Sequence, residues 1–340
     1  MVQTERTELL RAFRVRPFTP AWWAAGPHLQ TLAGKYLRPA LDLPLTRERW
    51  ETPDGDFLDL DFAPEPEGTD RAPVAVVLHG LEGGSRRGYA LLAYRELALR
   101  GVRAVGLNFR SCSGEPNRLA RSYHSGDTED LAFVLTRLAL RFPERQLGAL
   151  GFSLGGNVLL KFLGERGGAS PLVGAAVVSV PYDLAAGALT LESSAMGRLY
   201  GWYFLRSLRR KARWKSALWG ELVRLDEVLT ARTIREFDEL ATAPLHGFRG
   251  ADHYYAESSS AGYLSGITTP TLLLHSLDDP FLPPDIVPMA AIEGNAWLVS
   301  GIVERGGHVG FVQGTPNAPV FWAEQEAARF LAGALGAGSE

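Results

Sequence analysis

Short apolar runs alternate with longer amphipathic segments along most of the chain. Six of these runs are apolar at nearly every position, as expected for strands that are covered on both faces of a sheet. We therefore predict strands over Val74–Leu78, Val102–Leu107, Leu147–Phe152, Ala175–Val180, Thr271–His275 and Ala296–Val303.

Helical patterns lie between these predicted strands. In Asp127–Phe142 the apolar residues Leu131, Val134, Leu135 and Leu138 recur at helical spacing. Further helices are predicted over Tyr89–Arg100 and Asn157–Glu165. Strands and helices that alternate in this way predict an α/β protein, with a mostly parallel central sheet flanked by helices on both faces.

One long interval interrupts the alternation. Residues 182–269 are too many for an ordinary connection of about 2–6 residues, and Thr233-Ile-Arg-Glu236 matches a capping box at a helix start. We therefore predict a helical cap inserted into the sheet domain. The chain then divides into an N-terminal arm with leading strands (1–70), a first part of the core (71–181), the cap (182–269) and a second part of the core (270–340).

The composition and the hydropathy of the chain limit which partners and which cellular compartment we expect. With 46% hydrophobic residues, 21% charged residues and a net charge of −3, the chain gives no reason to expect nucleic acid as a partner. Its charged N-terminal segment lacks the apolar core of a signal peptide, and no stretch approaches the about 18 apolar residues of a spanning helix. We therefore expect a cytoplasmic protein. Nothing in the sequence indicates an oligomeric state.

A candidate nucleophile stands where a predicted strand meets a predicted helix. Gly151-Phe-Ser153-Leu-Gly155 has the Gly-x-Ser-x-Gly spacing of a nucleophile elbow, whose sharp turn exposes the serine hydroxyl and leaves no room for side chains two residues away. An ordinary Gly-rich turn between a strand and a helix is the alternative interpretation. The strand–turn–helix context favours Ser153 as the nucleophile of an α/β-hydrolase fold.

A serine hydroxyl needs a histidine base, and that histidine needs a carboxylate to hold its tautomer. In this fold the acid and then the histidine follow the serine in the chain. His308 lies in a Gly-rich loop after the last predicted strand, whereas His275 falls inside a strand and is expected to be a packed residue. We predict His308 as the base.

Two neighbouring aspartates compete for the acid, because both follow the strand Thr271–His275. The usual turn in these enzymes, Gly-x-x-Asp-x-x followed by an apolar residue and proline, selects Asp279 when Ser276 takes the place of the glycine, because Leu282-Pro283 then fits the end of the pattern. We predict Asp279 as the acid, with Asp278 as the alternative, and expect the other aspartate to cap the turn.

A tetrahedral intermediate requires backbone amides aimed at its oxyanion. One amide comes from the residue after the nucleophile, and the other comes from the loop after the first core strand. These would be the N–H groups of Leu154 and Leu81. His79 precedes the second of these amides, and we expect it to hold the loop by a hydrogen bond instead of acting in catalysis.

Several motifs outside the triad resemble one family. They are Pro27-His-Leu-Gln-Thr31, His79-Gly-Leu-Glu-Gly83, Asn108-Phe-Arg-Ser-Cys-Ser-Gly-Glu-Pro-Asn117, Tyr123-His-Ser-Gly126, Thr233-Ile-Arg-Glu-Phe-Asp238, Gly250-Ala-Asp-His-Tyr-Tyr255 and Gly306-Gly-His-Val-Gly-Phe311. Together they resemble the YheT-type esterases, which are related to lipid-acting abhydrolase-domain proteins. The resemblance covers most of the chain. It departs from the family at Ser111, where the family more often has glycine.

The resemblance implies hydrolysis of carboxylic esters with short or medium acyl chains, or of lipid esters, with Ser153, Asp279 and His308 as the triad. Two alternatives stay open: an acyltransferase that delivers the acyl group to an alcohol, and a ligand-binding protein without catalysis. We expect no cofactor. We also expect no metal, since His246 and His253 are not spaced as a metal pair. Cys112, the only cysteine, excludes an internal disulfide and is read as a small buried residue.

The cap contains a basic and aromatic stretch without any acidic residue, residues 198–215. Phe204, Leu208 and Ala212 would give it one apolar helical face. The simpler interpretation is a helix that packs inward and leaves its basic face in solvent. The alternative is a lid that rests on an anionic lipid or membrane surface.

Overall fold

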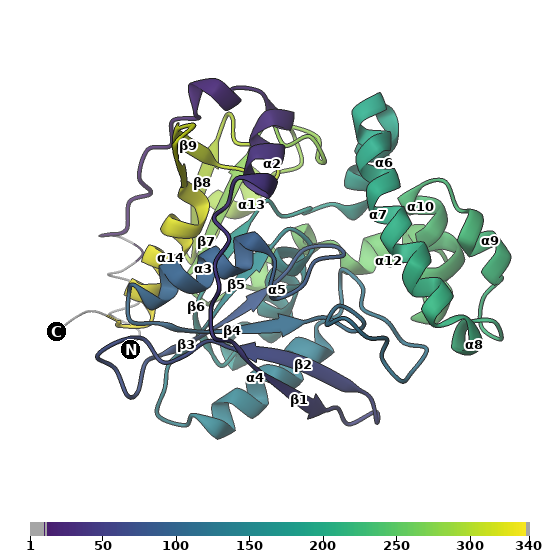
Figure 1. Ribbon diagram of the computed structural model, residues 1–340, viewed down its shortest axis with the longest axis horizontal. Helices are drawn as coiled ribbons and strands as arrows, with labels where there is room; N and C mark the ends of the chain where they lie inside the picture. Colours follow the sequence, from purple (N-terminus) through teal and green to yellow (C-terminus); the bar gives the residue numbers. More distant parts are fainter. Residues whose placement is uncertain (1–9, 11, 338–340) are drawn as a thin grey trace.

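The computed structural model describes residue 10 and residues 12–337. An eight-stranded sheet runs through the molecule in the order β1-β2-β4-β3-β5-β6-β7-β8 (Figure 1). Only β2 runs against its neighbours, so the prediction of a mostly parallel sheet is confirmed. The strands are β1 (Thr46–Glu51), β2 (Phe57–Phe62), β3 (Val74–Leu78), β4 (Arg103–Asn108), β5 (Leu147–Phe152), β6 (Leu172–Val178), β7 (Thr271–Ser276) and β8 (Leu298–Val303).

The predicted strands are all present, and only their ends differ. β6 begins three residues before the predicted Ala175 and ends at Val178, because the chain turns toward the cap after that residue. Residues of β3, β5, β6 and β7 are buried throughout. This is the burial that continuous apolar runs predict for strands covered on both faces.

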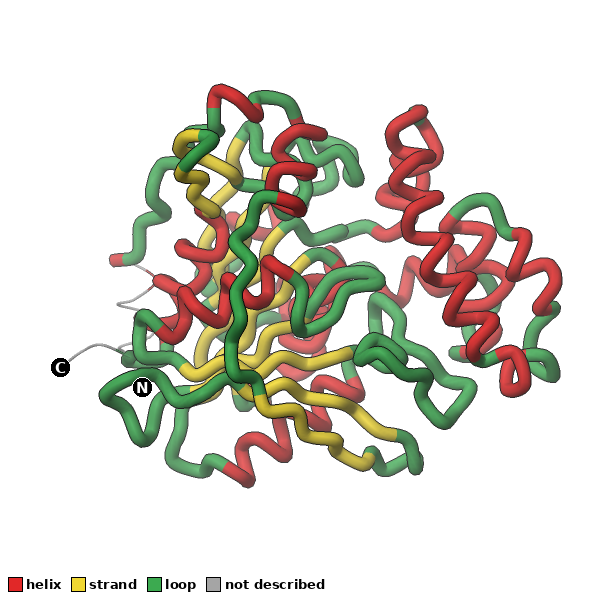
Figure 2. The backbone as a smooth tube through the Cα atoms, viewed as in Figure 1, coloured by secondary structure: helices red, strands yellow, loops and turns green. Residues whose placement is uncertain are grey.

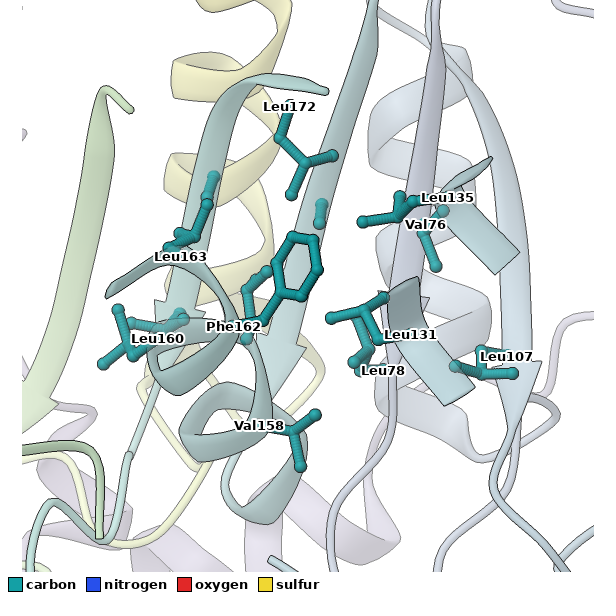
Figure 3. Close-up of a cluster of buried hydrophobic side chains, with 14 of the residues drawn as sticks. Val76, Leu78, Leu107, Leu131, Leu135, Val158, Leu160, Phe162, Leu163 and Leu172 are labelled. Carbon is teal, nitrogen blue, oxygen red and sulfur yellow. The ribbon is translucent and has the colours of Figure 1, made fainter. Parts of the chain in front are cut away.

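Helices cover both faces of the sheet. The apolar side of α4 (Glu129–Arg141) and α5 (Leu154–Arg166) forms one core cluster with the strands, and Figure 3 shows Leu131 and Leu135 from α4 beside Phe162 and Leu163 from α5. On the other face lie α3 (Gly88–Ala98) and α14 (Trp322–Ala334). The remaining elements around the sheet are η1 (Trp22–Ala24), α2 (Pro27–Tyr36), η2 (Gly167–Ala169), α13 (Met289–Glu293) and the hairpin of β9 (Val312–Thr315) and β10 (Ala318–Phe321).

Between β6 and β7 the chain leaves the sheet and forms a helical body, here called the cap (Figures 1 and 2). Its elements are α6 (Leu184–Ser193), α7 (Ala195–Trp214), α8 (Ser216–Trp219), α9 (Leu225–Thr230), α10 (Ile234–Phe237), the π-helical turn η3 (Asp238–Thr242), α11 (Ala243–Leu245) and α12 (Ala251–Ser258). The following segment η4 (Ser260–Gly266) packs against α5, where a Cβ on Gly164 would lie 2.2 Å from the Tyr263 carbonyl oxygen. The end of the predicted 182–269 insertion therefore lies on the core.

The predicted capping box at Thr233 is present in part: the threonine half is formed, whereas Glu236 binds the amide of the residue before Thr233. The Thr233 hydroxyl accepts a hydrogen bond from the Glu236 amide at 3.1 Å, and the Glu236 carboxylate accepts one from the Arg232 amide. These two bonds satisfy amides that have no partner inside α10.

The backbone conformation at Ser111 explains why glycine suits this position, where the chain departs from the family pattern. Ser111 has a φ of 61°, a conformation that glycine adopts without strain and other residues adopt rarely. Its hydroxyl accepts a hydrogen bond from the Asn117 amide at 3.1 Å, and its own amide donates to the Asn117 side chain. These two local bonds hold serine in a position that suits glycine.

Candidate active site

Ser153 stands at the sharp turn between β5 and α5, with a φ of 51° and a ψ of −119°. The turn requires glycine on both sides. A Cβ on Gly151 would lie 2.6 Å from the Gly155 carbonyl oxygen, and one on Gly155 would lie 2.6 Å from the His79 carbonyl oxygen. The first turn of α5 follows Ser153 directly, so the amide-bearing end of the helix faces the serine.

A hydrogen-bonded line joins the three predicted triad residues. The Ser153 Oγ lies 2.9 Å from the Nε2 of His308, and the Nδ1 of His308 lies 2.7 Å from the Oδ2 of Asp279. The Asp279 side chain is buried and that of His308 is 11% exposed. With Nδ1 donating to the carboxylate, Nε2 is left as the acceptor for the serine proton.

The two neighbouring aspartates have different partners. Asp279 accepts a hydrogen bond from the Phe281 amide through Oδ1, in addition to its contact with His308. Asp278 turns to the loop that carries the histidine, where its Oδ1 accepts hydrogen bonds from the Gly306 and Gly307 amides at 2.8 and 2.9 Å. Asp279 therefore contacts the imidazole, and Asp278 fixes the backbone of the loop that carries His308.

Helix α2 holds the His308 loop from the other side. The His308 amide donates to the Thr31 hydroxyl at 2.9 Å, and the Val312 amide donates to the Gln30 side chain at 2.7 Å. A Cβ on Gly307, which has a φ of 61°, would lie 2.5 Å from the Pro27 carbonyl oxygen. The triad motifs do not indicate this role of α2. The motif Pro27–Thr31 is the feature of the sequence that coincides with the helix.

The loop after β3 lies against the serine. A Cβ on Gly80 would be 3.2 Å from the Cβ of Ser153. The predicted oxyanion residues Leu81 and Leu154 line one cavity together with Ser153 and His308. The oxyanion role of their amides stays a prediction.

His79 is buried and holds this loop. Its Nδ1 donates to the Gly80 carbonyl oxygen at 2.8 Å, and its Nε2 accepts from the Phe109 amide at 3.2 Å. Burial lowers the pKa of His79 to about 3, so the ring is neutral in this role. The expectation of a loop-holding hydrogen bond is confirmed.

A buried ion pair ties the cap to the same loop, and the sequence did not indicate it. The Lys211 ammonium on α7 donates to the Glu82 carboxylate at 2.7 Å and to the Cys112 sulfur at 2.9 Å. Tyr123 also donates to Glu82, and its oxygen accepts from the Glu82 amide. Burial opposes the charge of Lys211, but the Cys112 thiol and the Glu82 carboxylate raise the pKa of the ammonium above its usual value. Glu82 has a φ of 53° and directly follows Leu81.

The basic stretch of α7 therefore differs from the expected solvated face. Lys211 is buried, and so is Lys215, which donates to the carbonyl oxygens of Leu119 and Arg121 at 2.7 and 2.8 Å. Burial lowers the pKa of Lys215 to about 8. The prediction that the basic residues as a group face solvent is wrong for these two lysines. Both of them instead bind groups of the core.

The cavity at the serine lies between the core and the cap and is mainly apolar. Its cap wall comes from α6, α7, α8, α10 and α11, and Phe281 stacks on the His308 ring with 4.2 Å between the ring centres. The apolar cap residues in the lining are Leu184, Ala188, Leu191, Phe204, Leu208, Trp219, Ile234, Phe237 and Leu245. A ligand at Ser153 would therefore meet hydrocarbon on the cap side.

Besides Glu82, the acidic residue Asp238 lines the cavity. Asp238 accepts hydrogen bonds from the Thr242 hydroxyl at 2.6 Å and from the Tyr255 hydroxyl at 2.8 Å. Burial raises its pKa to about 6. The cavity lining also includes His246, whose ring lies 4.6 Å from that of His124, and burial lowers the pKa of His246 to about 4.

Comparisons with known proteins place the chain in a family. It is 37% identical over 326 residues to "Putative esterase YheT" of Escherichia coli, covering 95% of each chain. It is 30% identical over 302 residues to human "Phospholipase ABHD3" (87% of this chain, 74% of the relative) and 32% identical over 275 residues to yeast "Monoacylglycerol lipase" (79% and 61%). The chain matches no family model. It belongs to the YheT family of α/β-hydrolase enzymes.

Solved structures agree on the fold. The Pyrococcus furiosus esterase PF2001 gives a TM-score of 0.55 at 15% identity, covering 96% of this chain and all of that one. The 2,6-dihydroxy-pseudo-oxynicotine hydrolase gives 0.54 at 16% identity, covering 91% and 72%. At these identities the likeness concerns the α/β-hydrolase fold alone. Within the described residues, no helix is both long and apolar enough to cross a membrane.

Proposed function

We propose that this protein is a serine hydrolase that cleaves carboxylic esters through an acyl-enzyme. The observation that carries the proposal is the hydrogen-bonded line from Ser153 through His308 to Asp279, with contacts of 2.9 and 2.7 Å, at an apolar cavity. Geometry of this kind suits a serine nucleophile, a histidine base and an orienting carboxylate.

The proposed reaction has two halves. The Ser153 oxygen attacks the ester carbonyl while the Nε2 of His308 takes the hydroxyl proton, and the amides of Leu81 and Leu154 stabilise the oxyanion. The intermediate collapses, the alcohol leaves with the proton from His308, and the acyl group stays on Ser153. Water then attacks the acyl-enzyme with His308 again as base, which releases the acid and restores the serine.

The proposed substrates are esters of short or medium acyl chains, or lipid esters. The apolar cap wall of the cavity supports an acyl chain, because burying hydrocarbon there contributes about 0.8 kcal/mol per methylene. The printed names of two relatives, a phospholipase and a monoacylglycerol lipase, support lipid esters.

A chain-length series of p-nitrophenyl esters tests the proposal, with the wild type and Ser153→Ala compared at each length. We expect turnover in the wild type with an optimum at short or medium chains, and loss of turnover in Ser153→Ala with the fold intact. A fluorophosphonate should label Ser153 alone. If Ser153→Ala retains turnover, or if the label maps to another serine, the proposed nucleophile is wrong.

Added alcohol separates hydrolysis from acyl transfer in the same assay. A hydrolase should release mainly free acid, whereas an acyltransferase would release mainly the new ester as the alcohol concentration rises. A wild type that binds the esters but turns none over would indicate the non-catalytic alternative.

A further inference from the structure

Two helices that flank His308 each have one side turned to the site and another turned to solvent. Helix α2 holds the His308 loop through the buried residues Gln30 and Thr31. Helix α7 lines the cavity through Phe204 and Leu208. Figure 1 places α2 and the first turns of α7 on the same, upper side of the molecule.

The outward sides of these helices carry large apolar side chains. They are 44% to 68% exposed, which is unusual for leucine and aromatic residues gathered on neighbouring elements. Leu29 and Tyr36 are seven residues apart on α2, and Leu199 lies three and four residues before Trp202 and Tyr203 on α7, which is helical spacing. We call this set the α2–α7 surface: Leu29, Tyr36, Leu199, Trp202 and Tyr203.

Direct contacts join the two halves of this surface and connect it to the site. The Lys35 ammonium lies 3.9 Å from the centre of the Tyr203 ring, and the Nδ1 of His28 lies 3.1 Å from the Tyr200 hydroxyl. The Tyr200 ring packs on Phe281 at 4.6 Å, and Phe281 stacks on His308. The seam between α2 and α7 therefore lies two ring contacts from the triad histidine.

The charged side chains of α2 and α7 are all basic. Neither α2 nor α7 contains an aspartate or a glutamate. Lys35, Arg198 and Arg206 are exposed on the same two helices. An apolar and aromatic surface surrounded by cations suits an anionic lipid interface, where tryptophan and tyrosine bury their rings at the headgroup level and arginine meets phosphate.

We propose that the α2–α7 surface binds the face of an anionic lipid bilayer. Arg198 and Arg206 are the arginines that meet the headgroups, whereas Lys211 of the same helix and Lys215 directly after it are buried and take no part. Binding brings the seam beside His308 against the lipid, so that an ester can move from the bilayer into the cavity. The binding itself needs no catalysis; only its use for lipid substrates rests on the proposed function.

Co-sedimentation with vesicles tests the proposal. Vesicles of equal phosphatidylcholine and phosphatidylglycerol are compared with pure phosphatidylcholine vesicles, at low and at high salt. We expect the wild type and Ser153→Ala to bind the anionic vesicles equally, and added salt to weaken that binding. Leu199→Ser/Trp202→Ser should lower the bound fraction about tenfold. Arg198→Gln/Arg206→Gln should lower it similarly and remove most of the salt dependence.

A matched control uses Leu140, which is 78% exposed on α4, away from the α2–α7 surface. Leu140→Ser should bind vesicles like the wild type. Leu140→Ser and the two double variants of the α2–α7 surface should keep wild-type turnover of a soluble p-nitrophenyl ester. Absence of wild-type binding at low salt overturns the proposal, as does an equal loss in Leu140→Ser. The proposal is also overturned if the wild type binds no vesicles but forms a dimer that Leu199→Ser/Trp202→Ser converts to monomers. The α2–α7 surface would then be covered by a second copy of the chain. Vesicle binding without any ester turnover would instead refute the proposed function and leave the surface proposal standing.

Discussion

The two walls of the cavity differ in what they contribute. The core wall carries Ser153, Asp279 and His308 on short loops that follow strands of the sheet. The cap wall is built from helices and contributes mainly hydrocarbon, with the ammonium of Lys211 reaching across to the loop of Leu81. The proposed reacting groups thus follow strands of the sheet, of which β5 and β7 are buried throughout, while the wall proposed to meet the acyl chain belongs to an insertion.

This division predicts how substitutions in the two walls differ. Changes at the core loops should act on the turnover number while the fold persists, because they alter a few atoms on a stable sheet. Changes in the cap should act on stability, on substrate length or on the position of the Leu81 loop. Lys211 is the exception that couples the walls, and it offers the sharpest test of the comparison.

The largest expected effect concerns the two aspartates of the core wall. Asp279→Asn should lower the turnover number by roughly 10³- to 10⁴-fold, since the amide no longer holds the imidazole in the required tautomer. Asp278→Asn keeps an oxygen that accepts from the Gly306 and Gly307 amides, so it should lose little turnover. Steady-state kinetics on one p-nitrophenyl ester measures both, and the reverse ranking would assign the acid to Asp278.

The second effect crosses from the cap to the core. Lys211→Met should reduce the turnover number by about tenfold to a hundredfold, because Glu82 loses its cationic partner and keeps only Tyr123, so that the neighbouring Leu81 amide shifts. It should also destabilise the fold by about 3–5 kcal/mol, as expected when one partner of a buried ion pair is removed.

Three further variants separate positioning from simple loss of stability. Lys211→Met/Glu82→Gln should cost no more than Lys211→Met alone, and Lys211→Arg should restore part of the turnover. Arg210→Met, an exposed neighbour on α7, is the matched control and should resemble the wild type. If Lys211→Met raises only KM and leaves the turnover number unchanged, Lys211 is merely part of the cavity lining.

The third effect is a pH dependence of stability that arises in the cap. Burial raises the pKa of Asp238 to about 6, above the ordinary value of 3.8, so the folded state binds this proton more tightly than the unfolded chain. The contribution of Asp238 to stability is therefore present at low pH and is lost as the pH rises from about 4 to about 6.

Asp238→Asn should remove this dependence. On going from pH 4 to pH 7, the variant should gain about 2–3 kcal/mol of unfolding free energy relative to the wild type, which corresponds to a shift of about two pKa units. Urea unfolding of both proteins at several pH values measures the difference. Parallel curves for the two proteins between pH 4 and pH 7 would contradict the prediction.

The smallest effect lies at the start of α10, away from the triad. Thr233→Ala removes the hydroxyl that accepts from the Glu236 amide and should destabilise the protein by about 1 kcal/mol, with ester turnover unchanged. Thr230→Ala is the matched control, because the Thr230 hydroxyl donates to carbonyl oxygens at a helix end and caps no amide. Equal losses in the two variants would show that the capping bond contributes nothing measurable.

The sequence by itself determined six of the eight strands of the sheet and the placement of the triad candidates. Continuous apolar runs predicted both ends of β3 and β5 correctly. Such strands are buried on both faces, so every position in them is apolar and the run has the same length as the strand. Ser153 was recognisable because the elbow needs glycine at fixed, short spacing, and the chain order of the fold then pointed to His308. Burial of a strand and the steric limits of a tight turn each constrain residues that are close together in the chain, so a short stretch of sequence is enough to recognise them.

Only the tertiary structure decided which distant groups meet. Thr31 supports the His308 amide across 277 residues, and Lys211 pairs with Glu82 across 129 residues. In the sequence Lys211 is one cation in a basic stretch, with nothing to separate it from Arg210 beside it. A helix pattern shows which side is apolar but not what packs against it, so the burial of Lys211 followed from the docking of the cap on the core. The sequence specified the proposed reacting groups, and long-range packing specified what holds them.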